Sequence, residues 1–289
     1  MAVRIVTDST SDIPLPVAKE MGITIIPQNV HFGDEVYRDG IDISNDDFYK
    51  KLIKGPAFPT TSQASAGIFA QTYETLAKDT ALRQAQDTAE ILSVHISSKL
   101  SGTYNSALLG RREVSGPCRI EVVDSLLISM GLGLVVIALA REAKAGATMD
   151  QLLARQKELV QQIEIYSVAD TLEFLQKGGR VSRLQAFFGS LLNIKPILHV
   201  MDGEVHLKER VRSRSQGVDR LVDIVEKAGK LADLSVLYTT APKDAQALAA
   251  RLDPFYPEKK ARIYQHGSTM GVHLGPGALG VTFLKASAP

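Results

Sequence analysis

VRIVTDSTSD, at residues 3–12, is a short apolar run that ends in a cluster of hydroxyl and carboxylate side chains. Residues 3–7 have the length and the β-branched content of a buried strand. Similar runs recur at residues 23–27, 90–96 and 119–123, and helical patterns separate them. Strands that alternate with helices predict a largely parallel sheet with helices on its faces.

Apolar residues recur at helical spacing between these runs. The spacing predicts helices over residues 46–53, 67–78, 103–114 and 132–144. The most apolar part of the chain, residues 126–140, is about 15 residues long, short of the roughly 18 to 20 that a membrane span needs. We therefore expect a buried helix there and no stable insertion into a membrane.

The second half of the chain has shorter strands. Asp202 and Gly203 join the apolar runs 196–201 and 204–211, and an Asp-Gly pair between two such runs is a strong hairpin signal. The remaining patterns predict a helix, a strand, a helix and two further strands at residues 216–231, 235–240, 243–252, 261–265 and 278–284. This order is typical of an α+β domain with a mixed or antiparallel sheet.

A domain boundary is expected near residue 165. A helical pattern over residues 149–163 ends there, and a new strand begins. Residues 1–165 are predicted to form an α/β domain with a mostly parallel, Rossmann-like sheet. Residues 166–289 are predicted to form the α+β domain.

Composition excludes several classes of function. The chain has 289 residues, with 33 Lys and Arg against 32 Asp and Glu, so its formal net charge is +1. This balance provides no overall positive field for nucleic acid. The single cysteine, Cys118, and six histidines without metal-ligand spacing predict neither a disulfide nor a metal site. The N-terminus has no basic segment followed by a long apolar run, so we expect a cytoplasmic protein without a signal peptide.

Hydroxyl side chains cluster at residues 7–12, 60–65 and 97–103, where strands end or helices begin. The carboxyl ends of parallel strands form the ligand crevice of an open sheet, and helix N-termini there offer free amides. Such hydroxyls can bind an oxyanion, although each of them can equally serve only as a helix cap. The convergence of three clusters favours an oxyanion site.

A glycine-rich stretch follows His273, and residues 275–280 match the spacing G-x-G-x-x-G. Too little chain follows to complete a dinucleotide-binding unit. We expect a loop in which the glycines allow close backbone approach, with His273 beside it.

Arg210, Arg212 and Arg214 repeat with a period of two after the predicted hairpin. They would share one face of an extended segment. Such a face is either simply solvated or a docking patch for an acidic partner or a phosphorylated ligand.

The sequence contains no G-x-S-x-G elbow, no G-K-[ST] phosphate loop and no H-E-x-x-H motif. Ser97, His273 and Asp124 can be combined into a hydrolase set, but nothing in their spacing supports it. An acyl hydrolase that uses Ser97 and His273 is kept as the alternative function.

Six motifs, in this order along essentially the whole chain, resemble the DegV family of bacterial fatty-acid-binding proteins, also called FakB proteins. They are TDSTSD at 7–12, TTSQ at 60–63, ISSKLSGTY at 96–104, DS at 124–125, GGR at 178–180 and HLGPGALG at 273–280. The departures are Ala64, where a proline is expected, and Leu274, where a threonine is frequent. Neither replaces a residue to which the resemblance assigns a ligand role.

The resemblance implies that one long-chain fatty acid, and no cofactor, is bound between two domains. It implies a carrier without catalytic activity, which presents the fatty acid carboxylate to a separate ATP-dependent kinase subunit. That subunit resembles dihydroxyacetone kinase and makes acyl phosphate for phospholipid synthesis.

The resemblance also implies which residues form the site. The carboxylate is assigned to Thr61, Ser62, Ser97 and His273, with Ser98 and Ser125 as weaker candidates. The loop 273–280 of the second domain would return to this site, and that domain would cover the acyl chain. Arg180 and Arg212 would face the kinase or the transferring phosphate. Apolar residues near the domain junction are candidates for the acyl-chain tunnel, although core packing explains them equally well: Ile128, Phe174 and Phe187.

Overall fold

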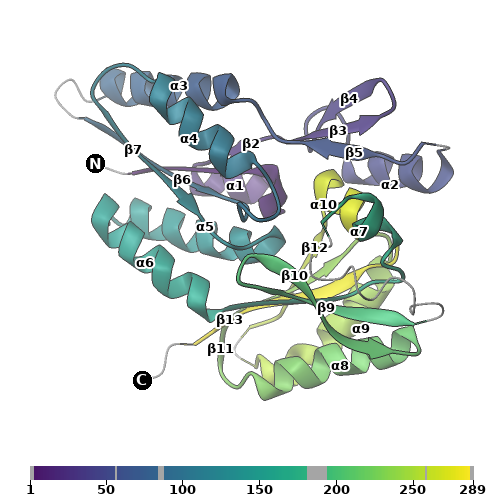
Figure 1. The fold of residues 1–289 in the computed structure, drawn as a ribbon. Coiled ribbons are helices and arrows are strands. Elements are labelled where there is room, and N and C mark those ends of the chain that lie inside the picture. Colours follow the sequence, from purple (N-terminus) through teal and green to yellow (C-terminus); the bar gives the residue numbers. More distant parts are fainter. Residues whose placement is uncertain (1–2, 56, 84–87, 181–193, 258, 287–289) are drawn as a thin grey trace. The chain divides into compact units, whose positions relative to one another are not determined.

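The computed structural model describes residues 3–286 except 56, 84–87, 181–193 and 258, and Figure 1 labels its helices and strands. The chain forms two compact units. The first unit comprises Met1–Asn29 and Ser62–Gln161, and the second comprises Val30–Thr61 and Gln162–Pro289.

The first unit contains a four-stranded parallel sheet with the strand order β2-β1-β6-β7. The strands are β1 (Arg4–Asp8), β2 (Ile23–Ile26), β6 (Ala89–His95) and β7 (Cys118–Asp124). The helices are η1 (Ser9–Ser11), α1 (Leu15–Met21), α3 (Ala66–Arg83), α4 (Thr103–Glu113), α5 (Ser129–Lys144) and α6 (Met149–Gln162). The predicted Rossmann-like sheet is confirmed.

Helices cover both faces of this sheet. In Figure 1, α3 and α4 lie on one side of β6 and β7, and α5 and α6 lie on the other. Val6, Ile91 and Ile120 pack with Phe69 and Tyr73 of α3 in a fully buried cluster. Almost all of α5 is buried, as its apolar sequence predicts. Within the described part of the chain, no helix is both long enough and apolar enough to cross a membrane.

The second unit contains a six-stranded mixed sheet with the order β10-β9-β8-β13-β11-β12, in which β11 and β12 pair in parallel. The strands are β8 (Ile163–Val168), β9 (Lys195–Met201), β10 (Glu204–Val211), β11 (Leu231–Tyr238), β12 (Arg262–Gln265) and β13 (Leu279–Lys285). Helices α8 (Arg214–Lys227) and α9 (Pro242–Leu252) cover one face with a large apolar cluster, and η3 (Asp253–Phe255) follows α9. The predicted mixed sheet is confirmed.

The predicted hairpin joins β9 and β10. Asp202 and Gly203 have φ values of 52° and 78°, the left-handed conformation that a two-residue type I′ turn requires at both positions. The helix predicted over residues 216–231 ends earlier, because Gly229 adopts φ 78° and Leu231 already begins β11.

The segment Val30–Thr61 does not follow the predicted division of the chain at residue 165. It was expected in the N-terminal domain, yet it belongs to the second unit. The segment contributes to a three-stranded sheet, β4-β3-β5, made of β3 (Asn29–Phe32), β4 (Glu35–Arg38) and β5 (Thr60–Ser62), and it carries α2 (Asn45–Lys54). The physical reason is an apolar cluster that joins Phe32 and Phe48 of this segment to Val272.

The described part of the second unit also contains two short helices, α7 (Glu173–Lys177) and α10 (Ser268–Leu274). His273 therefore lies in the last turn of a helix and not in the predicted loop. The loop begins only at Gly275, whose φ of 72° ends the helix.

Candidate functional site

The second unit brings together two of the predicted head-group residues, Thr61 and His273. Thr61 lies in β5 and His273 in the last turn of α10, so they are 212 positions apart in the sequence. Thr61 Oγ1 and His273 Nε2 are 3.1 Å apart. A hydroxyl and an imidazole at this distance share one hydrogen bond.

Gly178 lies against the Nδ1 edge of the His273 ring. A Cβ at position 178 would lie only 2.2 Å from His273 Nδ1 and 3.1 Å from the carbonyl oxygen of Phe174. Nδ1 is buried and has no hydrogen-bond partner among the described residues. The ring therefore directs its one hydrogen bond to a described residue toward Thr61.

The imidazole of His273 is neutral at neutral pH. Burial and, second, the positive charge of Arg180 lower the pKa of His273 from 6.5 to about 4. The unfolded chain thus binds a proton more readily than the folded one between these two values. The stability that depends on the neutral ring is fully present above pH 6.5 and is lost as the pH falls toward 4.

Arg180 lies next to this histidine. Its Nη1 donates to the carbonyl oxygen of Gly178 at 2.5 Å, and burial lowers the pKa of its guanidinium. Sequence reasoning assigned Arg180 to the partner or the transferring phosphate. The charge of Arg180 also helps to lower the pKa of His273, and its side chain contacts Gly178, the residue that lies against the His273 ring.

The glycine-rich loop after α10 approaches other backbone and side chains closely, as predicted. A Cβ on Gly275 would lie 2.2 Å from the ring of Phe174, and one on Gly277 would lie 2.0 Å from Asp170 Oδ2. Both glycines have positive φ values, 72° and 79°. A larger residue would strain this loop at either position.

Arg214 binds the same glycine-rich loop by a hydrogen bond. It does not share an extended face with Arg210 and Arg212. Its guanidinium donates to the carbonyl oxygen of Gly277 and, at 2.8 Å, to Asp244 Oδ2. The predicted face ends because Ser213 caps α8 through its hydroxyl, so the chain is helical from Arg214 onward.

The candidate tunnel residues have different surroundings. Phe174 of α7 packs against Phe58, with ring centroids 5.5 Å apart. Ile128, in the first unit, is buried immediately before α5. Phe187 lies outside the described residues. Of the two tunnel candidates that the structure describes, Phe174 lies beside the glycine-rich loop that begins at Gly275.

The remaining head-group candidates lie in the first unit, and three of them follow the neighbouring strands β6 and β7. Ser97 and Ser125 are fully buried, and Ser98 follows Ser97 after β6. The Ser97 backbone N–H donates to the carbonyl of Leu127 at 2.9 Å, and the Ser98 N–H donates to Asp124 Oδ1 at 3.1 Å. The loops after β6 and β7 therefore hold each other, which brings these three serines onto adjoining loops. Ser62 Oγ accepts from Asn29 Nδ2 at 3.5 Å.

A buried polar network in the first unit was missed by sequence reasoning. Tyr73 donates to Ser93 Oγ at 2.8 Å, Ser93 Oγ lies 2.6 Å from His95 Nε2, and His95 Nδ1 lies 2.9 Å from Asp8 Oδ2. Asp8 also accepts from the backbone N–H of Ile96 at 3.2 Å. The signal was present as polar residues on alternate positions of an otherwise apolar strand, β6.

This network has the order of a Ser-His-Asp triad, but it cannot act as one. Ser93, His95 and Asp8 are all 0% exposed, so no substrate atom reaches Ser93 Oγ. Its effect is structural, because it ties the end of β1 to the end of β6. The alternative hydrolase pair is not assembled within either unit, since Ser97 lies in the first and His273 in the second.

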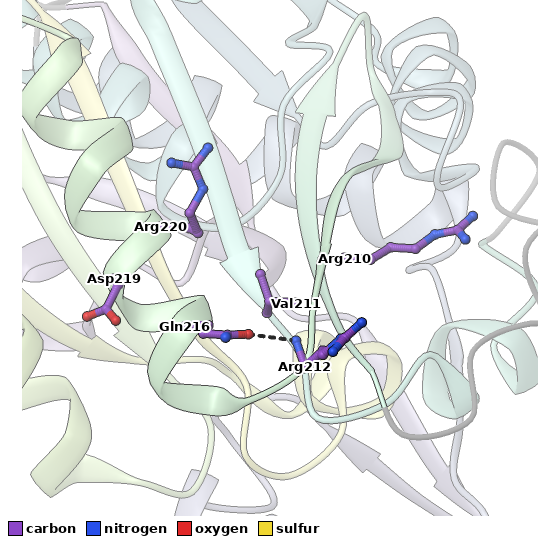
Figure 2. A pocket seen from close by; sticks show the side chains of 6 residues that line it. All are labelled: Arg210, Val211, Arg212, Gln216, Asp219 and Arg220. Atoms are coloured by element: carbon purple, nitrogen blue, oxygen red, sulfur yellow. Dashed lines mark hydrogen bonds between the residues drawn. The ribbon is translucent and has the colours of Figure 1, made fainter.

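Arg212 lines a pocket of about 450 Å³ at the start of α8. Its backbone N–H donates to Gln216 Oε1 at 2.9 Å, while its side chain is exposed. Figure 2 shows the guanidinium groups of Arg210 and Arg212 directed away from that of Arg220. Arg220 is already paired, with Glu209 at 2.6 Å and with an aspartate of α8.

The described residues contain no group of three side chains that could hold a metal ion.

The fold is that of a two-unit α/β protein. Its candidate site has hydroxyl groups and a neutral imidazole, which can hold an oxyanion by hydrogen bonds. The chain belongs to the DegV family. The model of that family, described as "Uncharacterised protein, DegV family", matches residues 2–286. The resemblance seen in the sequence motifs is thereby confirmed.

Known proteins resemble the chain over nearly its whole length. A DegV domain-containing protein of Streptomyces coelicolor is 36% identical over 282 residues, which are 96% of this chain and 97% of that protein. A DegV family protein from Thermus thermophilus, solved in a study of its fatty acid binding, has a TM-score of 0.85 and 32% identity. DegV of Bacillus subtilis, described as a fatty acid binding protein, has a TM-score of 0.87 and 30% identity. For both structures the match covers 99% of this chain and 100% of the other.

Proposed function

We propose that this protein binds a long-chain fatty acid and holds its carboxylate by hydrogen bonds from hydroxyl and imidazole groups. The observation that carries the proposal is the 3.1 Å contact between Thr61 Oγ1 and His273 Nε2. Two DegV proteins at 32% and 30% identity are described as binding fatty acids, which supports the same ligand class here.

The electrostatics of the site suit a carboxylate that must remain reactive. His273 is neutral at neutral pH because its pKa is about 4, so it offers a hydrogen bond and no full counter-charge. Arg180 adds positive potential near His273 without being one of the proposed ligands. A carboxylate held in this way keeps its negative charge and can attack a phosphoryl group.

The acyl chain supplies most of the proposed affinity. A chain of about fifteen methylenes, at roughly 0.8 kcal/mol each, has an upper bound near 12 kcal/mol before the costs of association. The head group then sets the register of the ligand. Phe174 is our first candidate for contact with the chain, followed by Ile128 and Phe187. Ser62, Ser97, Ser98 and Ser125 remain predicted head-group ligands.

Protein expressed in a bacterium is expected to carry a co-purified fatty acid in native mass spectrometry.

Thr61→Val keeps the side-chain shape but removes the hydroxyl, so palmitate affinity should fall about tenfold, the equivalent of 1.4 kcal/mol. Thr75→Val, at an exposed helical position, is the matched control and should bind normally. Ligand-free protein that also ignores added oleate would refute the proposal. Hydrolysis of an acyl ester that is lost in Ser97→Ala would instead favour the acyl hydrolase.

We also propose that the protein is not itself a catalyst and presents its ligand to an ATP-dependent fatty acid kinase subunit, which makes acyl phosphate for phospholipid synthesis. Such a kinase requires ATP, so we place the protein in the cytoplasm. The exposed Arg212 side chain, beside the pocket in Figure 2, is the docking candidate. Arg180 is the second candidate, although its electrostatic effect on His273 predicts an effect on ligand binding as well.

Arg212→Gln is expected to leave palmitate affinity unchanged and to lower acyl phosphate formation with the cognate kinase subunit about tenfold or more, because one charge-assisted contact is lost. Arg141→Gln, at another exposed position, should change neither quantity. Steady-state phosphorylation and binding assays on both variants measure the two effects separately. Equal rates of acyl phosphate formation in the two variants would show that Arg212 does not contribute to docking.

A further inference from the structure

Helix α10, which carries His273, has no N-terminal cap of its own. The residue at its N-cap position is Gly267, which provides no side-chain acceptor. The acceptor comes instead from Asp39, more than 200 positions earlier in the chain. Asp39 Oδ1 accepts the backbone N–H of Ser268 at 3.0 Å, and Oδ2 accepts that of Thr269 at 3.4 Å.

This arrangement is energetically significant because Asp39 is only 5% exposed. The first amides of a helix lack partners within the helix, and the helix dipole places partial positive charge there. A buried carboxylate satisfies both demands. A helix of seven residues is too short to be stable by itself, so such a cap contributes to its stability together with tertiary packing.

Three further contacts hold α10 against the segment that carries Asp39. Tyr49 donates to the carbonyl oxygen of His266 at 3.1 Å. Gly271 allows α2 to approach, since a Cβ there would lie 2.5 Å from the ring of Phe48 and 2.8 Å from the Tyr49 hydroxyl. Val272 is fully buried in the same apolar cluster as Phe48. His273 follows Val272 in the same helix, and these contacts therefore also restrain its position.

The same segment ends in Thr61, the partner of His273. Val30–Thr61 therefore supplies one member of the Thr61–His273 pair and also the cap that fixes the helix of the other. A change at Asp39 would remove the cap of α10 and leave the side chains of both Thr61 and His273 in place.

We propose that Asp39 is a positioning residue for His273 and thereby a determinant of carboxylate recognition. The proposal rests on the proposed function, because it concerns the head group of the same ligand. Asp39 itself does not contact the ligand; it acts through α10. Its loss should consequently weaken recognition of the carboxylate and spare the contribution of the acyl chain.

The test compares palmitate with methyl palmitate, which has the same chain but no carboxylate. In Asp39→Ala, palmitate affinity should fall about tenfold, while methyl palmitate affinity should stay within about twofold. Asp39→Asn keeps one acceptor oxygen, so its loss should be smaller, about threefold. Asp34→Asn, an exposed position on the same segment, is the matched control and should behave as the unmodified protein.

A second readout is independent of the ligand. The pKa of His273, measured by NMR titration, should rise from about 4 toward 6.5 in Asp39→Ala, because the displaced ring becomes more exposed to water. If Asp39→Ala does not fold, Tyr49→Phe replaces it. That variant lacks the hydroxyl that donates to the carbonyl oxygen of His266 and should show the same shift on a smaller scale.

Equal weakening of both ligands, with the His273 pKa unchanged, would overturn the proposal and leave Asp39 a purely structural residue. If the unmodified protein binds neither ligand or does not distinguish them, the proposed function fails. The role of Asp39 is then still decided by the titration, where an unchanged pKa in the variant counts against it.

Discussion

Gly178→Ala is expected to reduce palmitate affinity by about ten- to a hundredfold, which corresponds to the roughly 1–3 kcal/mol typical of overpacking. The added Cβ would lie 2.2 Å from His273 Nδ1 and 3.1 Å from the carbonyl oxygen of Phe174. Because Gly178 has an ordinary helical φ of −73°, alanine introduces no backbone strain. The imidazole must move, and its contact with Thr61 is lost. Isothermal titration calorimetry with palmitate measures the effect.

Gly67→Ala is the control for this substitution. Its Cβ would have no neighbour closer than 4.0 Å, and the position lies within α3, where alanine is preferred to glycine. Binding should be unchanged and stability equal or slightly higher. Normal palmitate affinity in Gly178→Ala, together with an unchanged His273 pKa, would show that the ring tolerates the methyl group and that Gly178 does not position it.

Asp8→Ala should cause the largest loss of stability, about 3–5 kcal/mol in the free energy of unfolding, as found when one partner of a buried polar pair is removed. The carboxylate accepts from His95 Nδ1, the backbone of Ile96, and both the backbone and the hydroxyl of Thr10. All these donors would lose their acceptor in a fully buried place. Urea unfolding followed by circular dichroism measures the change.

Asp8→Asn retains one acceptor oxygen and should lose about half as much, since its amide group opposes the His95 N–H. Asp79→Ala, an exposed position on α3, should stay within about 0.5 kcal/mol of the unmodified protein. A loss for Asp8→Ala no larger than for this control would contradict the view that the network ties β1 to β6.

Long and regular elements could be predicted from the sequence. Three parallel strands of the first unit, β1, β6 and β7, and helix α5 have enough residues for their pattern to be recognised, and the four-residue β2 is a continuous β-branched run. The β9–β10 hairpin could be predicted because Asp202 and Gly203 provide the required turn conformation locally. The three-residue β5 and the four-residue β3 and β4 were missed because they are short and, unlike β2, contain polar residues without β-branching that interrupt the run.

The candidate site was predictable only in part. Thr61 and His273 were singled out from motifs, and the structure brings them together. The Asp8–His95 network was missed, since a histidine on an apolar strand does not reveal its partner, which lies 87 positions away. Arg214 was expected on an exposed face, but the cap at Ser213 turns it toward the loop of Gly277.

Local signals in the chain specify the strand and helix periods, the Asp-Gly turn, the glycines after α10 and the hydroxyl clusters at strand ends. These depend on neighbours within a few residues. The packing of Val30–Thr61 with the C-terminal half and the cap that Asp39 provides for α10 depend instead on long-range contacts. Burial of Phe48 and Val272 in one cluster joins segments more than 200 residues apart, and no local pattern encodes that pairing. The position of His273 beside Thr61 is a consequence of this long-range packing.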